Sequence, residues 1–338
     1  MRYIAMKCGQ CGAALPPRSR WSVIDCSYCG ARTVLDGSSI VLRAEYKRAL
    51  AEVAAERAGR SALRLEGQDY ELASGPIRGE SCDVYAGWRC APLPQAVFVK
   101  IPRDKAGAAR LERESATLEE LQASAARGAA YFSQSVPEPV AFGAVSGGAW
   151  KGRRALIVRR RSGFVETLAD VAAASGRDPR HSVWIWKRLL EVLDWTHRAG
   201  RAHAALVPRH AVIHARDHGV MLVGWSASVA LGERLGEIWS ADEPFYAREA
   251  LDGAPLSARA DLVMAARCVA FSLTGRPDDP GRALPAPLQE LLTPWIDGTS
   301  PGPNDAWTLR EAVSAAASAA FGPPKYAPLK SPAWAGSR

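Results

Sequence analysis

The chain has 338 residues, 48% of them hydrophobic, and a formal net charge of +8 at pH 7. This length is enough for one large domain and a small one, and the apolar content supports a full core. No run of residues approaches the roughly 18 apolar positions of a membrane span, so we expect no membrane-embedded part. The N-terminus leads directly into a cysteine motif without a visible secretory signal. We therefore expect a cytoplasmic protein, and the high Ala, Arg and Pro content suggests a bacterial one.

Four cysteines in residues 1–40 have the spacing of a metal site. Cys8 and Cys11 are followed, after fourteen residues, by Cys26 and Cys29, which gives the pattern C-x2-C-x14-C-x2-C. Four thiolates would give Zn²⁺ a closed tetrahedral shell, so the predicted zinc is structural. A segment of this size buries too little apolar surface to fold alone, and bound metal would make up the difference.

The segment resembles the zinc-ribbon family, whose members bind nucleic acid in some proteins and protein partners in others. Residues 1–36 carry a formal charge of +3, which four thiolates and one zinc ion lower to about +1. That is a weak footprint for a phosphate backbone, so we favour a protein contact or docking within the chain. The whole chain with zinc stays moderately basic, at +6, and nucleic acid remains a possible partner. The other three cysteines, at positions 82, 90 and 268, lack metal spacing.

After the ribbon, the pattern predicts a helical linker over residues 41–65, with the helix at 41–59. Residues 66–160 then contain short buried-strand patterns and one helix, and residues 161–322 are mainly helical. The expected strands include 97–100 and 155–158, and the expected helices are 109–123, 167–174, 182–198, 258–273, 288–293 and 308–320. Residues 323–338 form a proline-rich tail, which we expect to be extended or disordered.

Two motifs in the second half are similar to those of protein kinases. Residues 203–210, HAALVPRH, resemble the catalytic loop H-R-D-L-x-x-x-N, with Ala205 at the catalytic Asp and His210 at the metal-binding Asn. Residues 220–226 fall where kinases have a strand and then D-F-G, and Gly224 occupies the magnesium-binding Asp position. Phosphoryl transfer needs a group that positions the substrate hydroxyl and ligands for magnesium, and these three positions lack them. The resemblance therefore implies a pseudokinase.

The first half matches other kinase landmarks in the same order. Residues 77–84 align with the glycine loop, of which only the middle glycine, Gly79, is kept, and Glu80 would place negative charge near a phosphate. Lys100 matches the lysine of V-A-I-K, and Glu114 matches its glutamate partner on the next helix. The pair has two readings: a vestigial nucleotide site with Gly79, or an ion pair that holds the helix against the sheet. We favour the structural reading, with ATP binding weak or absent.

Scaffold positions of the family are also present. Asp261 matches the acid that braces the catalytic-loop backbone, and His203 and Trp225 stand where kinases stack a histidine and a phenylalanine. His203, His210 and Asp217 are candidates for substitute catalytic groups, but packing or hydrogen bonding is the commoner role for such residues. Arginines 159–161 form the densest basic run, either a solvated edge or a contact for an acidic partner.

The sequence thus predicts an α+β protein: a two-lobed protein kinase-like fold preceded by a small zinc ribbon. We expect a catalytically inactive pseudokinase that acts as a protein-binding scaffold or regulatory subunit for components of its own system. One alternative is a divergent kinase-fold transferase that binds nucleotide through Lys100 and Glu114. A second is a nucleic-acid-associated factor that uses the ribbon and the basic run.

Overall fold

The computed structural model describes residues 60–91, 94–174, 178–282, 284–302 and 304–329, and the backbone of residues 23–25 and 32–34. The chain divides into two compact units, Met1–Ser61 and Ala62–Arg338. In the first unit, β1 (Val23–Asp25) pairs antiparallel with β2 (Arg32–Val34). The predicted helix at 41–59 and the four ribbon cysteines lie outside the described residues.

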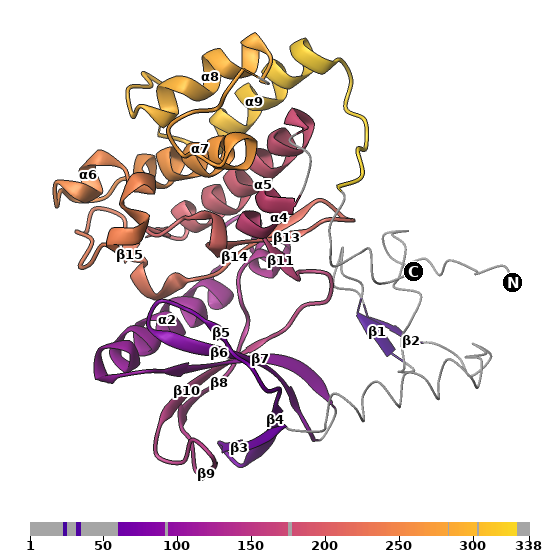
Figure 1. The fold of residues 1–338 in the computed structure, drawn as a ribbon, viewed down its shortest axis with the longest axis vertical. Coiled ribbons are helices and arrows are strands. Elements are labelled where there is room, and N and C mark those ends of the chain that lie inside the picture. Colours follow the sequence, from indigo (N-terminus) through magenta and orange to yellow (C-terminus); the bar gives the residue numbers. More distant parts are fainter. Residues whose placement is uncertain are drawn as a thin grey trace, which may run out of the picture. The chain divides into compact units, whose positions relative to one another are not determined.

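The second unit begins with a curled antiparallel sheet, drawn in the lower part of Figure 1. Its order is β8-β10-β7-β6-β4-β3-β9, and β5 pairs with β6 beside this path. The strands are β3 (Ser61–Leu65), β4 (Gln68–Leu72), β5 (Ile77–Arg78), β6 (Cys82–Arg89), β7 (Gln95–Pro102), β8 (Pro139–Ala144), β9 (Gly147–Gly148) and β10 (Arg154–Arg159). The helix α2 (Lys105–Ala123) and the short α3 (Ala129–Phe132) connect β7 to β8. The sheet starts at Ser61, inside the segment expected to be a linker.

Residues after β10 are mainly helical, with two small sheets (Figure 1). The sheets are β11-β13-β14 and β12-β15. Their strands are β11 (Glu166–Thr167), β12 (Arg201–Ala202), β13 (Ala211–His214), β14 (Gly219–Leu222) and β15 (Val229–Ala230). The helices are α4 (Leu168–Ala174), α5 (Pro179–Arg198), α6 (Arg248–Leu251), α7 (Ala258–Thr274), α8 (Ala286–Ile296) and α9 (Ala306–Phe321). The expected α+β class is confirmed, as are a strand-rich first half and a helical second half.

The period-two alternation of β7 and β10 divides the core between the two faces of the sheet. Val97, Val99 and Ile101 of β7 pack into a cluster that belongs to the sheet alone. Leu156 and Val158 of β10 point to the other face and join a larger cluster with α2, α5 and α7. Because one continuous apolar cluster includes residues of the sheet and of the helical half, the two halves share a core.

The central helices α5 and α7 explain why the second half is stable around the motif residues. α5 packs against both α7 and α9 and buries Trp186 and Trp195. Asp178 caps the N-terminus of α5, and Gly275 ends α7 in a left-handed conformation that suits glycine. Among the described helices, none is long and apolar enough to cross a membrane.

Candidate functional site

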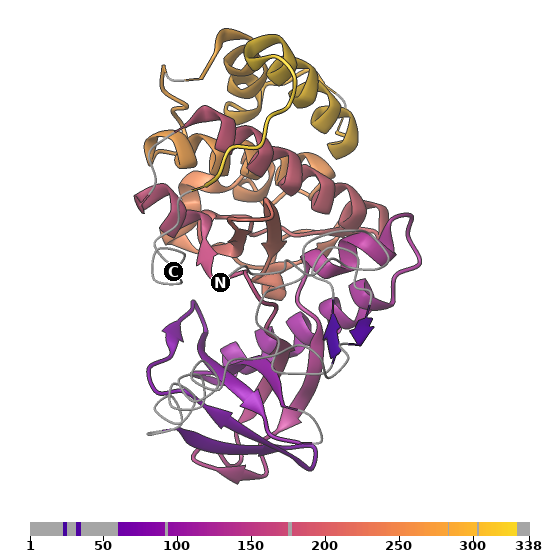
Figure 2. The same cartoon turned by 90° about the vertical axis from the view of Figure 1, so that its right-hand side faces the viewer.

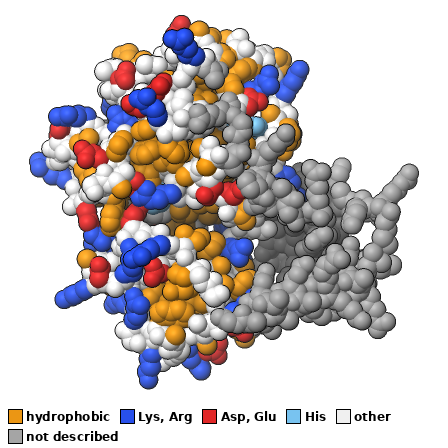
Figure 3. Space-filling view, in the orientation of Figure 1, with side chains coloured by type: hydrophobic (Ala, Val, Ile, Leu, Met, Phe, Trp, Pro, Cys, Tyr) orange, Lys and Arg blue, Asp and Glu red, His pale blue; other side chains and the backbone are white. Residues whose placement is uncertain are grey.

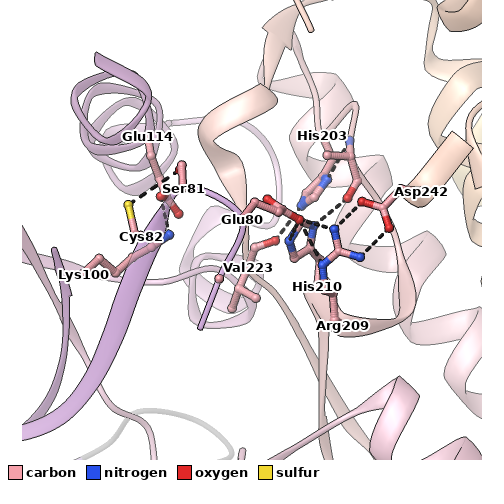
Figure 4. A network of polar contacts seen from close by, with 12 residues as sticks. Glu80, Ser81, Cys82, Lys100, Glu114, His203, Arg209, His210, Val223 and Asp242 are labelled. Atoms are coloured by element: carbon pink, nitrogen blue, oxygen red, sulfur yellow. Dashed lines mark hydrogen bonds and ion pairs between the residues drawn. The ribbon is translucent and has the colours of Figure 1, made fainter. Parts of the chain in front are cut away.

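Lys100 and Glu114 form the expected ion pair between β7 and α2. The Lys100 ammonium donates to the Glu114 carboxylate (Figure 4). The Glu114 side chain is almost fully buried, at 3% exposure, and that of Lys100 is 19% exposed. A buried carboxylate without a partner would cost free energy, so the lysine has a structural task that requires no nucleotide. The contact ties α2 to the sheet.

The backbone of residues 203–205 is held by a buried carboxylate from α7. Asp261 is fully buried, and its two oxygens accept hydrogen bonds from the backbone N–H groups of His203 and Ala204, each at 2.8 Å. A third donor, His197 Nε2, lies 2.9 Å from the same carboxylate. Ala204 has φ of +63°, an unusual value for a residue with a side chain. Asp261 therefore braces a strained turn, as the sequence predicted.

His203 is a buried packing residue whose two ring nitrogens are both used. Its Nε2 donates to the carbonyl of Val223 at 3.0 Å, and its Nδ1 accepts from the backbone of Ala205 at 3.3 Å. Burial lowers its pKa to about 4, although the nearby Asp261 charge acts in the opposite direction. The neutral ring stands edge-on against Trp225, with centroids 4.5 Å apart. The predicted histidine–aromatic contact is confirmed.

The His210 ring fills the space that a side chain at position 224 would need. A Cβ atom built on Gly224 would lie 2.7 Å from three atoms of the His210 ring, which no real side chain tolerates. The ring is fixed in that space because Nδ1 donates to the Ala205 carbonyl at 2.7 Å and Nε2 lies 3.1 Å from a Glu80 oxygen. The ring thus excludes any side chain at position 224.

Glu80 reaches from the turn between β5 and β6 to the helical half of the unit (Figure 4). Its carboxylate accepts from Arg209 Nε at 3.0 Å and contacts His210, and Arg209 also donates to both oxygens of the buried Asp242. Burial would raise the pKa of Glu80, but hydrogen bonds and charges from His210 and Arg209 lower it to about 2. Glu80, Arg209, His210 and Asp242 thus form one connected cluster of polar side chains, the 80/209/210/242 network.

The turn that presents Glu80 depends on the one glycine kept from the expected loop. The Gly79 N–H donates to the Cys82 carbonyl at 2.9 Å, and a Cβ on Gly79 would lie 3.0 Å from that oxygen. Arg103 donates to the carbonyls of Gly79 and Cys82, at 2.8 and 3.1 Å. The backbone carbonyls of this turn are therefore engaged by an arginine of the same half, and Gly79 is explained by the tight turn itself.

Two further ion pairs link α2 to segments of the helical half. Arg110 pairs with Glu237 through two of its nitrogens and lies over the Trp239 ring, 4.9 Å from the centroid. Arg201 of β12 donates to Glu120 at 3.0 Å. Pairs with exposed members contribute little individually. Together with the buried Glu114 contact they give α2 partners on both of its sides.

Among the described residues, the structure brings most of the predicted site residues together. Lys100, Glu114 and Gly79 lie in the half that contributes Glu80. The positions with the lost chemical groups, 205, 210 and 224, meet in the other half. Cys8, Cys11, Cys26 and Cys29 lie outside the described residues, and in the part that is described no cluster of three metal-binding side chains occurs.

Other candidates from the sequence have structural partners. Asp217 pairs with Arg216 and lies 3.4 Å from His214, in the turn between β13 and β14. In the basic run, Arg159 and Arg161 both pair with Glu138, at 3.1 and 3.3 Å. Sequence reasoning missed Arg209 and Asp242, because no spacing rule connects them to Glu80.

The chain matches no known protein family, and no curated protein is similar to it.

Proposed function

We propose that residues 66–320 form a two-lobed protein kinase-like fold and that this chain is a catalytically inactive pseudokinase. Three contacts support the resemblance: the pair of Lys100 and Glu114, the bonds from Asp261 to the loop backbone, and the edge-on rings of His203 and Trp225. Each joins residues that the kinase motifs place together, although they are distant in sequence. These contacts concern the scaffold of the fold and not its chemistry.

The observation that carries inactivity is the fixed His210 ring between Ala205 and Gly224. Kinases use three oxygen- or nitrogen-bearing side chains at these positions to orient the substrate hydroxyl and to hold magnesium. Here two positions have no functional group, and both nitrogens of the third are engaged. Magnesium prefers oxygen ligands in octahedral geometry, which the imidazole ring of His210 does not offer. The two carboxylates of the 80/209/210/242 network, Glu80 and Asp242, are both paired with Arg209.

The function that remains is binding. We infer that the chain acts as a protein-binding scaffold or regulatory subunit for other components of its system. A rigid body suits that role, because little conformational entropy is lost on association. The 80/209/210/242 network, the pairs of α2 and the shared core all restrain the two halves of the unit relative to each other.

The divergent transferase remains the second candidate, and one observation favours it. The ion pair of Lys100 and Glu114 is the arrangement that kinases use to position nucleotide phosphates. The nucleic-acid reading has less support, since arginines 159 and 161 pair with Glu138. On the face shown in Figure 3, basic and acidic side chains are interspersed over the described residues.

A radiolabelled ATP assay separates the first two candidates. We expect no autophosphorylation and no transfer to generic substrates with magnesium or manganese, and a weak nucleotide affinity that does not depend on magnesium.

Lys100→Ala should lower the thermal stability, by about 1–3 kcal/mol, because it leaves the buried Glu114 without a partner, and the variant should keep partner binding. The exposed Lys151 provides a matched control, Lys151→Ala. Label incorporated by the native chain and by the control, but lost in a folded Lys100→Ala chain, would establish the transferase instead.

We also propose a structural zinc ion held by Cys8, Cys11, Cys26 and Cys29. The paired C-x2-C spacing supports it, and Cys26 and Cys29 lie in sequence between the two paired strands of the first unit. Metal analysis of the purified chain should give about one zinc ion per chain.

Cys8→Ser should lose that metal and unfold the first unit while leaving the second intact. Cys90→Ser is the control, since Cys90 lacks metal spacing, and it should keep the zinc. A folded first unit without metal, or disulfides between the cysteine pairs, would refute the site.

A further inference from the structure

The proline-rich segment after α9 packs back onto the second unit. It leaves the helix at Gly322, which has φ of +74°, and its described residues, 323–329, form no helix or strand. Figures 1 and 2 show this segment, in yellow, running along the α5 side toward the β13–β14 hairpin. Its described part ends at Leu329, which is only 7% exposed and belongs to the large core cluster. The tail is thus a bound segment up to this residue.

Tyr326 packs on an aromatic surface that is formed by Trp184 of α5 and His218 of the turn between β13 and β14. Its ring stacks on the His218 ring, with centroids 4.7 Å apart and planes at 22°. Trp184 stacks on His218 as well, at 4.3 Å and 2°. The Tyr326 ring itself stays 63% exposed. The contact is therefore a ring lying on a prepared aromatic surface and not a buried core residue.

Two hydrogen bonds fix the position of the segment on this aromatic surface. The Tyr326 hydroxyl donates to the Arg216 carbonyl at 2.9 Å. His218 Nε2 lies 2.9 Å from the Ala327 carbonyl, and since a carbonyl only accepts, the imidazole nitrogen donates. His218 has φ of +51°, a left-handed turn conformation, and Arg188 donates to its carbonyl at 3.1 Å. Contacts with Trp184 and Arg188 therefore hold His218 in place without the segment. The segment itself contributes the ring and hydroxyl of Tyr326, the carbonyl of Ala327 and the side chain of Leu329.

The composition of the segment matches this mode of binding. In residues 323–329, Pro323, Pro324 and Pro328 restrict the chain to extended conformations. Proline-rich peptides bind aromatic-lined surfaces well because little conformational entropy is lost on binding. Tyr326 and Leu329 are the side chains directed to the body, while Lys325 and Pro328 remain exposed. Few contacts hold the segment, so its release requires less free energy than unfolding of the core.

We propose that Trp184, His218, the Arg216 carbonyl and the apolar residues packed around Leu329 form a peptide-binding site for extended Tyr-x-Pro-Leu segments. The chain's own residues 326–329 fill the site in cis, and a partner protein with a proline-rich segment of this chemistry competes for it. The proposal rests on the protein-binding role above for the identity of the competitor. It is independent of the nucleotide site, so the ATP assay and the peptide experiment can fail separately.

The test uses the full chain and a labelled peptide with the sequence of residues 323–330, PPKYAPLK. The cis segment acts as a competitor at a high effective concentration, so the native chain should bind the peptide weakly. Tyr326→Ala removes the ring and the hydroxyl of the competitor, and should increase the peptide affinity about tenfold in a fluorescence anisotropy titration. Tyr326 is exposed, and an unchanged melting temperature will show that the variant is folded.

Three matched controls make the result specific. Tyr131→Ala removes another exposed tyrosine, 44% exposed, and should leave the affinity at the native value. Adding His218→Ala to the Tyr326→Ala chain should abolish binding, and so should a peptide in which alanine replaces the tyrosine. Equal affinity of the native and Tyr326→Ala chains, or equal binding of the alanine peptide, would overturn the proposal.

Discussion

Replacing Asp261 with asparagine is expected to be among the most destabilising changes of this protein. The carboxylate is fully buried and receives donors from the backbone of His203 and Ala204 and from His197. An asparagine keeps one acceptor and turns an amide donor toward groups that are themselves donors. We expect a loss of about 3–5 kcal/mol in the free energy of unfolding, typical of a broken buried charged network. Urea denaturation followed by tryptophan fluorescence measures it.

The control for this change is Asp278→Asn. Asp278 pairs with Arg276 at the surface and both side chains are more than 60% exposed, so the loss should be far smaller than that of Asp261→Asn. A loss below about 1 kcal/mol for Asp261→Asn would contradict the bracing role, because an unsatisfied buried donor alone costs that much.

The pH dependence of the same pair of chains gives a second check. Burial would raise the pKa of Asp261, but the hydrogen bond and charge of His197, with further donors, lower it below its usual value. A carboxylate with a lowered folded pKa contributes stability above its unfolded pKa of about 3.9, and the contribution disappears as the pH falls through the folded pKa. The stability difference between the native and Asp261→Asn chains should therefore be full above pH about 4 and decrease in stronger acid.

Sequence patterns found the elements whose signals are local. The helix expected at 109–123 is α2, which begins earlier, at Lys105, because Asp104 caps it by accepting from the Gly107 N–H at 2.6 Å. A glycine inside a helix lowers its intrinsic propensity, so the first turn was missed. The strand expected at 97–100 is β7, longer by two residues at each end. Pairing with β6 over its whole length extends it beyond its apolar run.

One strand pair escaped prediction although its turn was visible in the sequence. β3 and β4 are joined by Glu66 and Gly67, both with positive φ, which is the geometry of a tight hairpin turn. Glu-Gly is a weaker turn signal than Asn-Gly or Asp-Gly. The sequence pattern therefore places the strand before this turn in the linker. The start of the sheet at Ser61 depends on how the strands pair, and β4 pairs with β6, which lies further along the chain.

In the candidate site, too, some contacts follow from sequence motifs and others do not. Motif order placed Lys100 opposite Glu114, and Asp261 beneath the turn of residue 203, because the motifs encode a long-range arrangement. The pairing of Glu80 with Arg209 spans 129 residues and no motif encodes it. The docking of Tyr326 on His218 has no periodic signal either. A chain with 43 basic and 35 acidic side chains allows too many ion pairs for charge alone to select one.

Restoring a carboxylate at position 224 is expected to damage the fold without any benefit in chemistry. Gly224 has φ of +81°, and a Cβ there would lie 2.7 Å from the His210 ring. Gly224→Asp therefore combines backbone strain with displacement of a ring held by Ala205 and Glu80. We expect a loss of about 2–4 kcal/mol in the free energy of unfolding, measured by urea denaturation.

A double-mutant cycle separates the clash from the strain. His210→Asn removes the ring, so Gly224→Asp in that background should cost only the strain, and the coupling between the two positions should be about 1–2 kcal/mol. Gly152→Asp is the matched control, since Gly152 has φ of +84° and a Cβ at this position would have no neighbouring atom within 4 Å, so the change should cost about as much as the strain alone. Additive effects at positions 210 and 224 would show that the ring yields freely. In that case His210 would not be the group that fills the space of the missing carboxylate, and only the absence of functional groups at Ala205 and Gly224 would account for inactivity.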